Sequence, residues 1–137
     1  MLMLCPYCGS ATKVTNSRSH NDSQAVWRRR QCKACQAIWT TDEQYDLSKT
    51  HQVSYGPQTD SEPFERDILF MSIWKALQHR KTALRDATAL TSTIITKVLA
   101  QKSQVIDVVD IASAAHDTLK QYDQVAASVY QASHTYE

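Results

Sequence analysis

Four cysteines arranged in two CxxC pairs are the residues of this chain whose chemistry is easiest to assign. The pairs are Cys5-Pro6-Tyr7-Cys8 and Cys32-Lys33-Ala34-Cys35, and 23 residues separate them. Two thiolates from each pair complete the tetrahedral sulfur set that structural zinc prefers, and such a closed set leaves no open position for catalysis at the metal. The spacing therefore predicts a structural Zn2+ site. The alternative is two redox pairs or free structural thiols.

The residues between and after the cysteine pairs predict a small antiparallel sheet. Thr12 to Arg18 and Ala25 to Gln31 are β-prone runs, and Asn21-Asp22-Ser23 between them is typical of a turn. A third β-prone run, Ala37 to Thr41, follows the second pair. Because about 40 residues bury too little surface to fold alone, we expect this ribbon to require its metal.

Three consecutive arginines lie on the strand that leads into the second cysteine pair. Strand alternation places Arg28 and Arg30 on one face and Arg29 on the other. Arginine binds phosphate in a bidentate manner, so the run predicts contacts with a nucleic-acid backbone. Lys13 and Arg18 on the neighbouring strand would extend the contact surface. The alternative is a solvated run of charge.

The distribution of charge supports a separate basic unit. The chain has a net charge of +1, but residues 1–41 carry six basic and one acidic side chain, whereas residues 42–137 carry nine basic and thirteen acidic ones. A basic N-terminal part on an acidic remainder indicates that only the first part meets a polyanion. We assign residues 1–46 to a DNA-binding zinc ribbon.

Residues 47–61 are polar and predict a linker with a hairpin that leads into the second unit. A turn is expected at Gly56-Pro57, with Val53 and Tyr55 in a short strand before it. Helical periodicity begins at Glu62-Pro63-Phe64, where Pro63 suits the first position of a helix.

Residues 62–137 predict a mainly helical domain. Asp107 is expected to cap the third helix, and Asp110 lies in its first turn. The apolar positions that recur at helical spacing are Leu69, Ile73, Ala76 and Leu77; then Ala87, Leu90, Ile94, Val98 and Leu99; then Ile111, Ala115, Leu119 and Tyr122. The fold class is therefore α+β, a small antiparallel ribbon followed by helices.

Several function classes find no support in the residues. The chain has two glycines, Gly9 and Gly56, and therefore no glycine-rich phosphate loop. Its five histidines lie in no recognisable catalytic or ligand motif, so no catalytic residue is assigned and an enzyme is not expected. No apolar run is long enough to span a membrane, and nothing near Met1 is typical of a signal peptide. A cytoplasmic protein without membrane contact is expected.

The motifs resemble those of a known bacterial family, the ribonucleotide reductase regulators called NrdR, which join a zinc ribbon to an ATP-cone domain. The resemblance is carried by CPYCGS from Cys5, TKVTNSR from Thr12, WRRRQC from Trp27 and WTTDE from Trp39. Farther along, EPFERDIL from Glu62 resembles the start of the first helix of the cone. The resemblance covers nearly the whole chain.

This resemblance implies a transcriptional repressor that binds promoter boxes in double-stranded DNA. It implies that Arg28, Arg29 and Arg30 contact DNA, and that the cone binds ATP or dATP and thereby changes the state of a homo-oligomer. The nucleotide-binding positions then fall at Val53, Tyr55, Glu62 and Phe64.

The cone departs from the family pattern where charge matters. The family's hairpin has a lysine and an Asp-Gly, whereas this chain reads VSYGP from Val53, and a lysine expected in the first helix falls at Ile68. A second hypothesis is therefore a zinc-ribbon nucleic-acid-binding protein whose degenerate cone only self-associates and does not sense nucleotide. A third hypothesis is an accessory subunit of the reductase. It would need the cone without DNA binding, and the three consecutive arginines argue against it.

Overall fold

The structure is a computed structural model that describes residues 3–19 and 25–134 of the chain. The chain divides into two compact units, Met1–Tyr45 and Asp46–Glu137, which we call the ribbon and the helical unit. The turn predicted at Asn21 to Ser23 lies outside the described residues.

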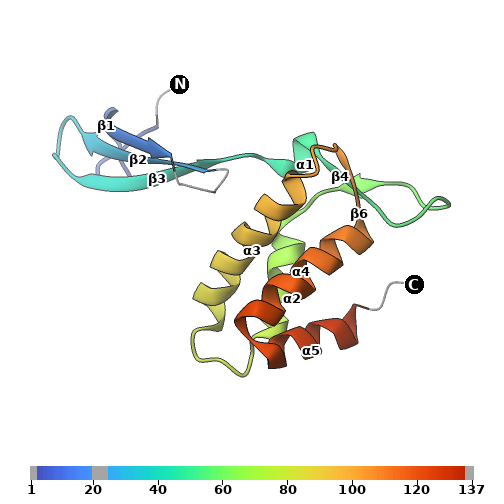
Figure 1. Ribbon diagram of the computed structural model, residues 1–137. Coiled ribbons are helices and arrows are strands. Elements are labelled where there is room, and N and C mark those ends of the chain that lie inside the picture. Colours follow the sequence, from blue (N-terminus) through green and yellow to red (C-terminus); the bar gives the residue numbers. More distant parts are fainter. Residues whose placement is uncertain (1–2, 20–24, 135–137) are drawn as a thin grey trace. The chain divides into compact units, whose positions relative to one another are not determined.

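The ribbon is a three-stranded antiparallel sheet with strand order β1-β2-β3 (Figure 1). The strands span Thr12–Ser19, Ala25–Cys32 and Ile38–Gln44. Each predicted strand is present, and the third extends farther than expected. The strand β1 carries an irregularity between Val14 and Asn16, where its pairing with β2 shifts by one residue. Because of this bulge, Lys13 and Asn16 lie on the same face of the sheet although they are three positions apart.

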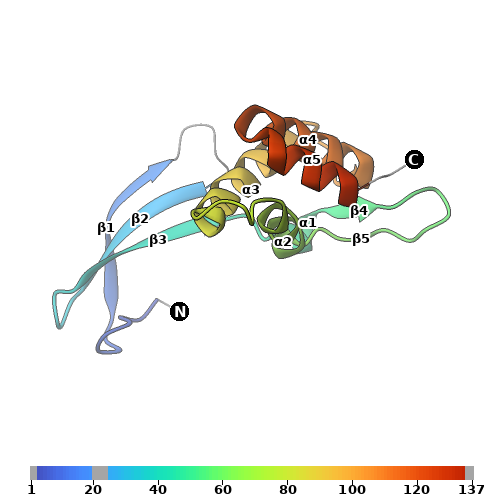
Figure 2. The ribbon, with the colours of Figure 1, turned by 90° about the horizontal axis from the view of Figure 1, so that it is seen from below.

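The helical unit contains four longer helices and a second small sheet (Figures 1 and 2). The helices that form its core are α2 (Arg66–Ala76), α3 (Ala83–Leu99), α4 (Val108–Tyr122) and α5 (Gln124–Ser133). The short helix α1 (Leu47–Thr50) precedes the strands β4 (Gln52–Ser54) and β5 (Glu62–Pro63). The strand β6 (Val105–Asp107) lies beside β4. In this sheet β4 is central, antiparallel to β5 and parallel to β6.

One hydrophobic core holds the helical unit together. Ile73, Leu77, Ile94 and Leu119 are completely buried, as their helical spacing predicts. Ile106 on β6 and Val53 on β4 join the same cluster, so the small sheet is packed against the helices. The α+β fold class predicted from the sequence is therefore confirmed.

The start of the helical unit differs from the expectation in two places. Pro63 does not begin a helix, because Glu62 and Pro63 form β5 and the helix α2 begins at Arg66. Proline has no amide hydrogen to donate, which this two-residue edge strand tolerates. In the predicted linker, Leu47 and Val53 are buried in the core, so residues 47–61 contribute structure as well as connection.

Two local predictions are confirmed by hydrogen bonds. The side chain of Asp107 accepts a hydrogen bond from the amide of Val109 at 2.9 Å and so caps α4. The amide of Thr59 donates to the carbonyl of Gly56 at the predicted turn, where Gly56 has a φ of 131°. Within the described residues, none of the helices has both the length and the apolar character that a membrane span requires.

Candidate metal centre and nucleic-acid interface

The structure brings all four cysteine sulfurs together at one end of the ribbon. The Sγ atoms of Cys5, Cys8, Cys32 and Cys35 lie within 4.8 Å of one another. The Sγ of Cys5 is 3.7 Å from that of Cys35, and the Sγ of Cys8 is 3.4 Å from that of Cys32. Four thiolates about 2.3 Å from a tetrahedral Zn2+ are separated by about 3.8 Å, so the donor set fits this ion.

The two cysteine pairs form matching turns. In each turn the amide of the first cysteine donates to a carbonyl five residues later, at Ser10 and Ala37 respectively. The residue four positions after that cysteine has a positive φ, 76° at Gly9 and 63° at Gln36. Gln36 thus adopts the left-handed conformation that glycine usually takes, and the turn survives without glycine.

Backbone amides point at the sulfurs of Cys5 and Cys32. The amide of Tyr7 donates to Cys5 Sγ at 3.4 Å, and the amides of Ala34 and Cys35 donate to Cys32 Sγ at 3.3 and 3.4 Å. These donors offset part of the negative charge of a tetrathiolate site and fix the orientation of each sulfur.

The thiols differ in acidity. Hydrogen bonds from the side chain and backbone of Ser10 lower the pKa of Cys8 to about 6. Although a backbone hydrogen bond from Ala37 lowers the pKa of Cys35, burial and the neighbouring thiols raise it to about 12. A bound Zn2+ removes this difference in protonation, because every ligand thiol gives up its proton to the solvent when it coordinates the metal.

One face of the sheet carries Arg28 and Arg30, and both side chains have partners within the ribbon. Arg28 donates to Glu43 at 2.9 Å through Nη2 and to Ser17 Oγ at 2.8 Å through Nη1. Arg30 Nη1 donates to Thr12 Oγ1 at 3.3 Å, and Arg30 Nε is buried with no hydrogen-bond partner among the described residues. These two arginines therefore hold the sheet together.

The opposite face carries the other cations of the strands, and we call it the Arg29 face. The strand register places Lys13, Asn16 and Arg18 of β1 on the same side as Trp27, Arg29 and Gln31 of β2 and Ile38, Thr40 and Asp42 of β3. Arg29, Lys13 and Arg18 are all exposed. Among the described residues, the side chain of Arg29 makes no hydrogen bond or ion pair. The two residues expected to extend the contact surface thus accompany Arg29 and not the other two arginines.

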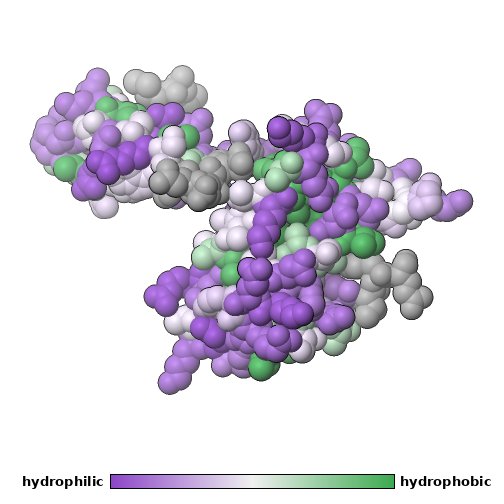
Figure 3. Space-filling view, viewed as in Figure 1, coloured by the Kyte–Doolittle hydropathy of each residue, from purple (hydrophilic) through white to green (hydrophobic). Residues whose placement is uncertain are grey.

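The four residues expected at the nucleotide site surround one cavity in the helical unit. Val53, Tyr55, Glu62 and Phe64 all line a cavity of about 220 Å³ between the β4–β5 hairpin and the helices α2, α4 and α5. Figure 3 shows hydrophobic surface gathered toward β4 and β6 on a face that is otherwise mostly hydrophilic over the helices. The other lining residues are Pro63, Glu65, Ile68, Leu69, Ser72, Val108, Ile111, Ala112, Tyr130 and His134.

The cavity does not fit a nucleoside triphosphate. Its described lining contains two glutamates, Glu62 and Glu65, and no lysine or arginine. Phosphate groups need cationic or amide donors, and two carboxylates repel them. The nearest basic residue in sequence, Arg66, does not line the cavity, and its Nη2 donates to Ser92 Oγ at 2.8 Å.

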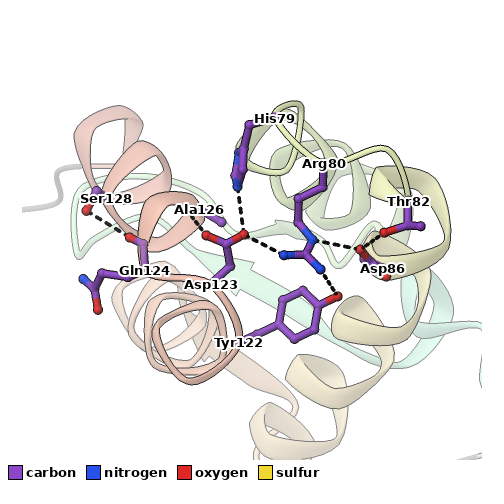
Figure 4. Close-up of polar contacts among 9 residues, drawn as sticks. All are labelled: His79, Arg80, Thr82, Asp86, Tyr122, Asp123, Gln124, Ala126 and Ser128. Atoms are coloured by element: carbon purple, nitrogen blue, oxygen red, sulfur yellow. Dashed lines mark hydrogen bonds and ion pairs between the residues drawn. The ribbon is translucent and has the colours of Figure 1, made fainter.

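A polar cluster in the helical unit has no counterpart in the sequence-based predictions (Figure 4). Arg80 Nε donates to Asp86 at 3.1 Å, its Nη1 donates to Asp123 at 3.0 Å, and its guanidinium stacks on the ring of Tyr122. His79 Nε2 lies 2.8 Å from Asp123 Oδ2. Tyr122 and Asp123 are more than 40 residues from His79 and Arg80 in the chain, so no local motif reveals these contacts. The cluster joins the α2–α3 turn to the junction of α4 and α5.

Comparisons with known proteins agree with these observations. Residues 3–43 match the family described as transcriptional repressor NrdR-like, N-terminal domain. The transcriptional repressor NrdR of Micrococcus luteus is 34% identical over 134 residues, which cover 94% of this chain and 79% of the relative. Those of Symbiobacterium thermophilum and Acidiphilium cryptum are 32% and 35% identical, and each match covers 94% of this chain and 87% of the relative.

These names describe transcriptional regulation, which is not an enzymatic role, in agreement with the sequence-based prediction. The zinc-ribbon match and the four clustered cysteines together support a structural Zn2+. The relatives match across both units of the chain, with the identities and coverage given above. The chain therefore belongs to the NrdR family of transcriptional repressors.

Proposed function

We propose that this protein is a zinc-dependent repressor of ribonucleotide reductase genes that binds promoter boxes in double-stranded DNA through the Arg29 face of its ribbon. The observation that carries this proposal is the exposed set of Lys13, Arg18 and Arg29 on one side of a metal-stabilised sheet. Exposed cations without internal partners are free to exchange counterions for phosphates.

The ribbon's two faces have different roles in this proposal. Arg29, Lys13 and Arg18 contact DNA directly, whereas Arg28 and Arg30 support the sheet through Glu43, Ser17 and Thr12. Asp42 at the edge of the Arg29 face limits how far the positive surface extends. Three phosphate contacts would give a logarithmic salt slope of about −2.7, at about −0.9 for each contact.

A gel-shift experiment tests DNA binding. The zinc-loaded protein is expected to shift duplexes from the upstream regions of ribonucleotide reductase genes in preference to unrelated duplexes. Replacing Lys13, Arg18 and Arg29 together by alanine is expected to abolish the shift without changing the zinc content. Lys75→Ala in the helical unit removes one exposed charge and serves as the control. A preserved shift in the triple variant would refute the assigned interface.

Regulation through the helical unit allows two hypotheses. The resemblance implies control by ATP or dATP, and the second hypothesis is that the unit self-associates without sensing nucleotide. The glutamates and the absence of lysine and arginine in the described cavity lining favour the second. Calorimetry with ATP and dATP distinguishes them, since saturable binding at millimolar nucleotide supports sensing and its absence supports the second hypothesis.

An apolar surface on α2 supports self-association. Ile68 and Met71 are 61% and 52% exposed, and Trp74 on the same side of the helix is 38% exposed. Neighbouring exposed apolar side chains are typical of a surface that contacts another protein surface. We expect Met71→Glu to reduce the oligomer size measured by sedimentation, whereas Lys75→Ala beside it leaves the size unchanged. An unaltered oligomer in Met71→Glu would place the contact elsewhere.

A further inference from the structure

The cavity between the β4–β5 hairpin and the helices α2, α4 and α5 is built to hold a ring. Phe64 and Tyr130 are only 2% and 4% exposed and form part of its wall. The ring of Tyr130 stacks on that of His134 with 4.0 Å between the centroids and 10° between the planes. Val108, Ile111 and Ala112 of α4 contribute further apolar surface. Walls of this kind bind flat apolar molecules through burial and stacking.

The polar groups of the cavity set the sign of charge that it accepts. Glu62 on β5 and Glu65 at the N-cap of α2 both line the cavity. Neither lysine nor arginine occurs among the described lining residues. A ligand with a positive charge gains from both carboxylates, and a ligand with a negative charge is repelled by both.

The helix ends near the cavity reinforce this preference. A helix N-terminus attracts anions when its amides are free. Here α4 begins at Val108, and its next amide, that of Val109, is already bound by the carboxylate of Asp107. At the start of α2 the capping residue is itself the acidic Glu65. Each of these two helices therefore has an acidic residue at its N-cap position, whose charge opposes the binding of an anion there.

We propose that this cavity binds an aromatic small molecule that carries no negative charge, with a preference for a cationic amine. The ring lies against Phe64 and Tyr130, and the amine lies toward Glu62 and Glu65. This assignment is independent of DNA binding by the ribbon, and it replaces a triphosphate as the expected ligand of the helical unit.

Three indole probes that share a ring and differ in charge test the proposal. Tryptamine is cationic, tryptophol is neutral and indole-3-acetate is anionic at neutral pH. In calorimetric titrations of the full zinc-loaded chain, we expect tryptamine to bind about threefold more tightly than tryptophol and about tenfold more tightly than indole-3-acetate, because the carboxylates are exposed and partly screened. ATP is not expected to displace tryptamine.

Substitutions assign the binding to this cavity. In the double variant Glu62→Gln and Glu65→Gln, the three probes are expected to bind with affinities within about a factor of two of one another, because the charge that separates them is gone. Ser72→Trp and, as a second blocking variant, Ala112→Leu narrow the cavity and are expected to weaken all three probes. Ser128→Trp on the exposed side of α5 is the matched control.

The affinities of the probes for the parent chain and the variants decide whether the cavity binds them as proposed. Three results together support the proposal. They are the expected order of affinities, the loss of that order in the double glutamine variant, and weaker binding in a blocking variant that keeps its circular dichroism spectrum. Absence of saturable binding, tightest binding of indole-3-acetate, displacement of tryptamine by ATP, or binding that survives in both folded blocking variants would overturn it.

Discussion

The ribbon and the helical unit are stabilised in different ways. Among the described residues of the ribbon, only Cys5, Thr12 and Cys32 are buried, and two of these three are metal ligands. The helical unit instead has a continuous core of twenty buried residues drawn from every helix and from the strands β4 and β6. The metal therefore replaces a core in the first unit, whereas burial alone suffices in the second.

The largest expected effect separates the two units by removing zinc. A chelator, or Cys32→Ser, is expected to abolish the sheet β1–β3, because binding of structural zinc contributes on the order of 10 kcal/mol in small zinc domains. The helical unit is expected to remain folded. Amide chemical shifts in nuclear magnetic resonance spectra measure both units at once. Dispersed ribbon signals without metal would contradict the comparison.

The reverse experiment weakens the core of the helical unit. Leu119 is completely buried, and Leu119→Ala is expected to lower the free energy of unfolding of this unit by about 2–5 kcal/mol. Zinc content and the ribbon signals are expected to stay unchanged. Val129→Ala on the exposed side of α5 is the control, with little expected loss. Thermal unfolding followed by circular dichroism at 222 nm, which reports the helices, provides the measurement.

The contrast between the units also explains what the sequence predicts well. The metal site depends on spacings of a few residues, and the strands, their alternation and the cap at Asp107 are local properties. The start of α2 was predicted incorrectly because Pro63 suits both a first helical position and an edge strand, and only pairing with Gln52 decides between them.

The side-chain contacts that the sequence did not predict depend on long-range packing. The contacts of Arg80 with Tyr122 and Asp123 depend on how the α2–α3 turn meets the α4–α5 junction. The partnership of Arg28 with Glu43 requires the register of β2 against β3. That register divides three adjacent arginines into supporting and exposed side chains, a distinction that composition alone does not make.

A smaller effect is expected from the polar cluster of the helical unit. Arg80→Ala leaves Asp86 and Asp123 without their shared cation, so the melting temperature of the helical unit is expected to fall, by less than in Leu119→Ala. The exposed Arg85→Ala on the same helix as Asp86 is the matched control. Equal melting temperatures for the two variants would show that the cluster contributes nothing to stability.

The smallest effect is a dependence on pH. The hydrogen bond from His79, followed by that from the amide of Ala126, holds the pKa of Asp123 well below its usual range. A depressed pKa stabilises the folded state above the unfolded-state pKa of about 4, and this contribution is lost as the pH falls below it. We therefore expect the difference in melting temperature between the parent chain and Asp123→Asn to shrink between about pH 5 and pH 2. A constant difference would contradict this assignment.

DNA binding through the Arg29 face of the ribbon can be tested by comparing two substitutions on β2. Fluorescence anisotropy of a promoter duplex, titrated with Arg29→Ala and Arg28→Ala at several salt concentrations, compares the two faces of β2. Loss of one charge-assisted phosphate contact in Arg29→Ala is expected to weaken binding about tenfold and to reduce the salt slope by about 0.9. Arg28→Ala, whose side chain is engaged by Glu43 and Ser17, is expected to keep the parent slope. A reduced slope in Arg28→Ala with an unchanged slope in Arg29→Ala would show that the opposite face of the sheet binds DNA.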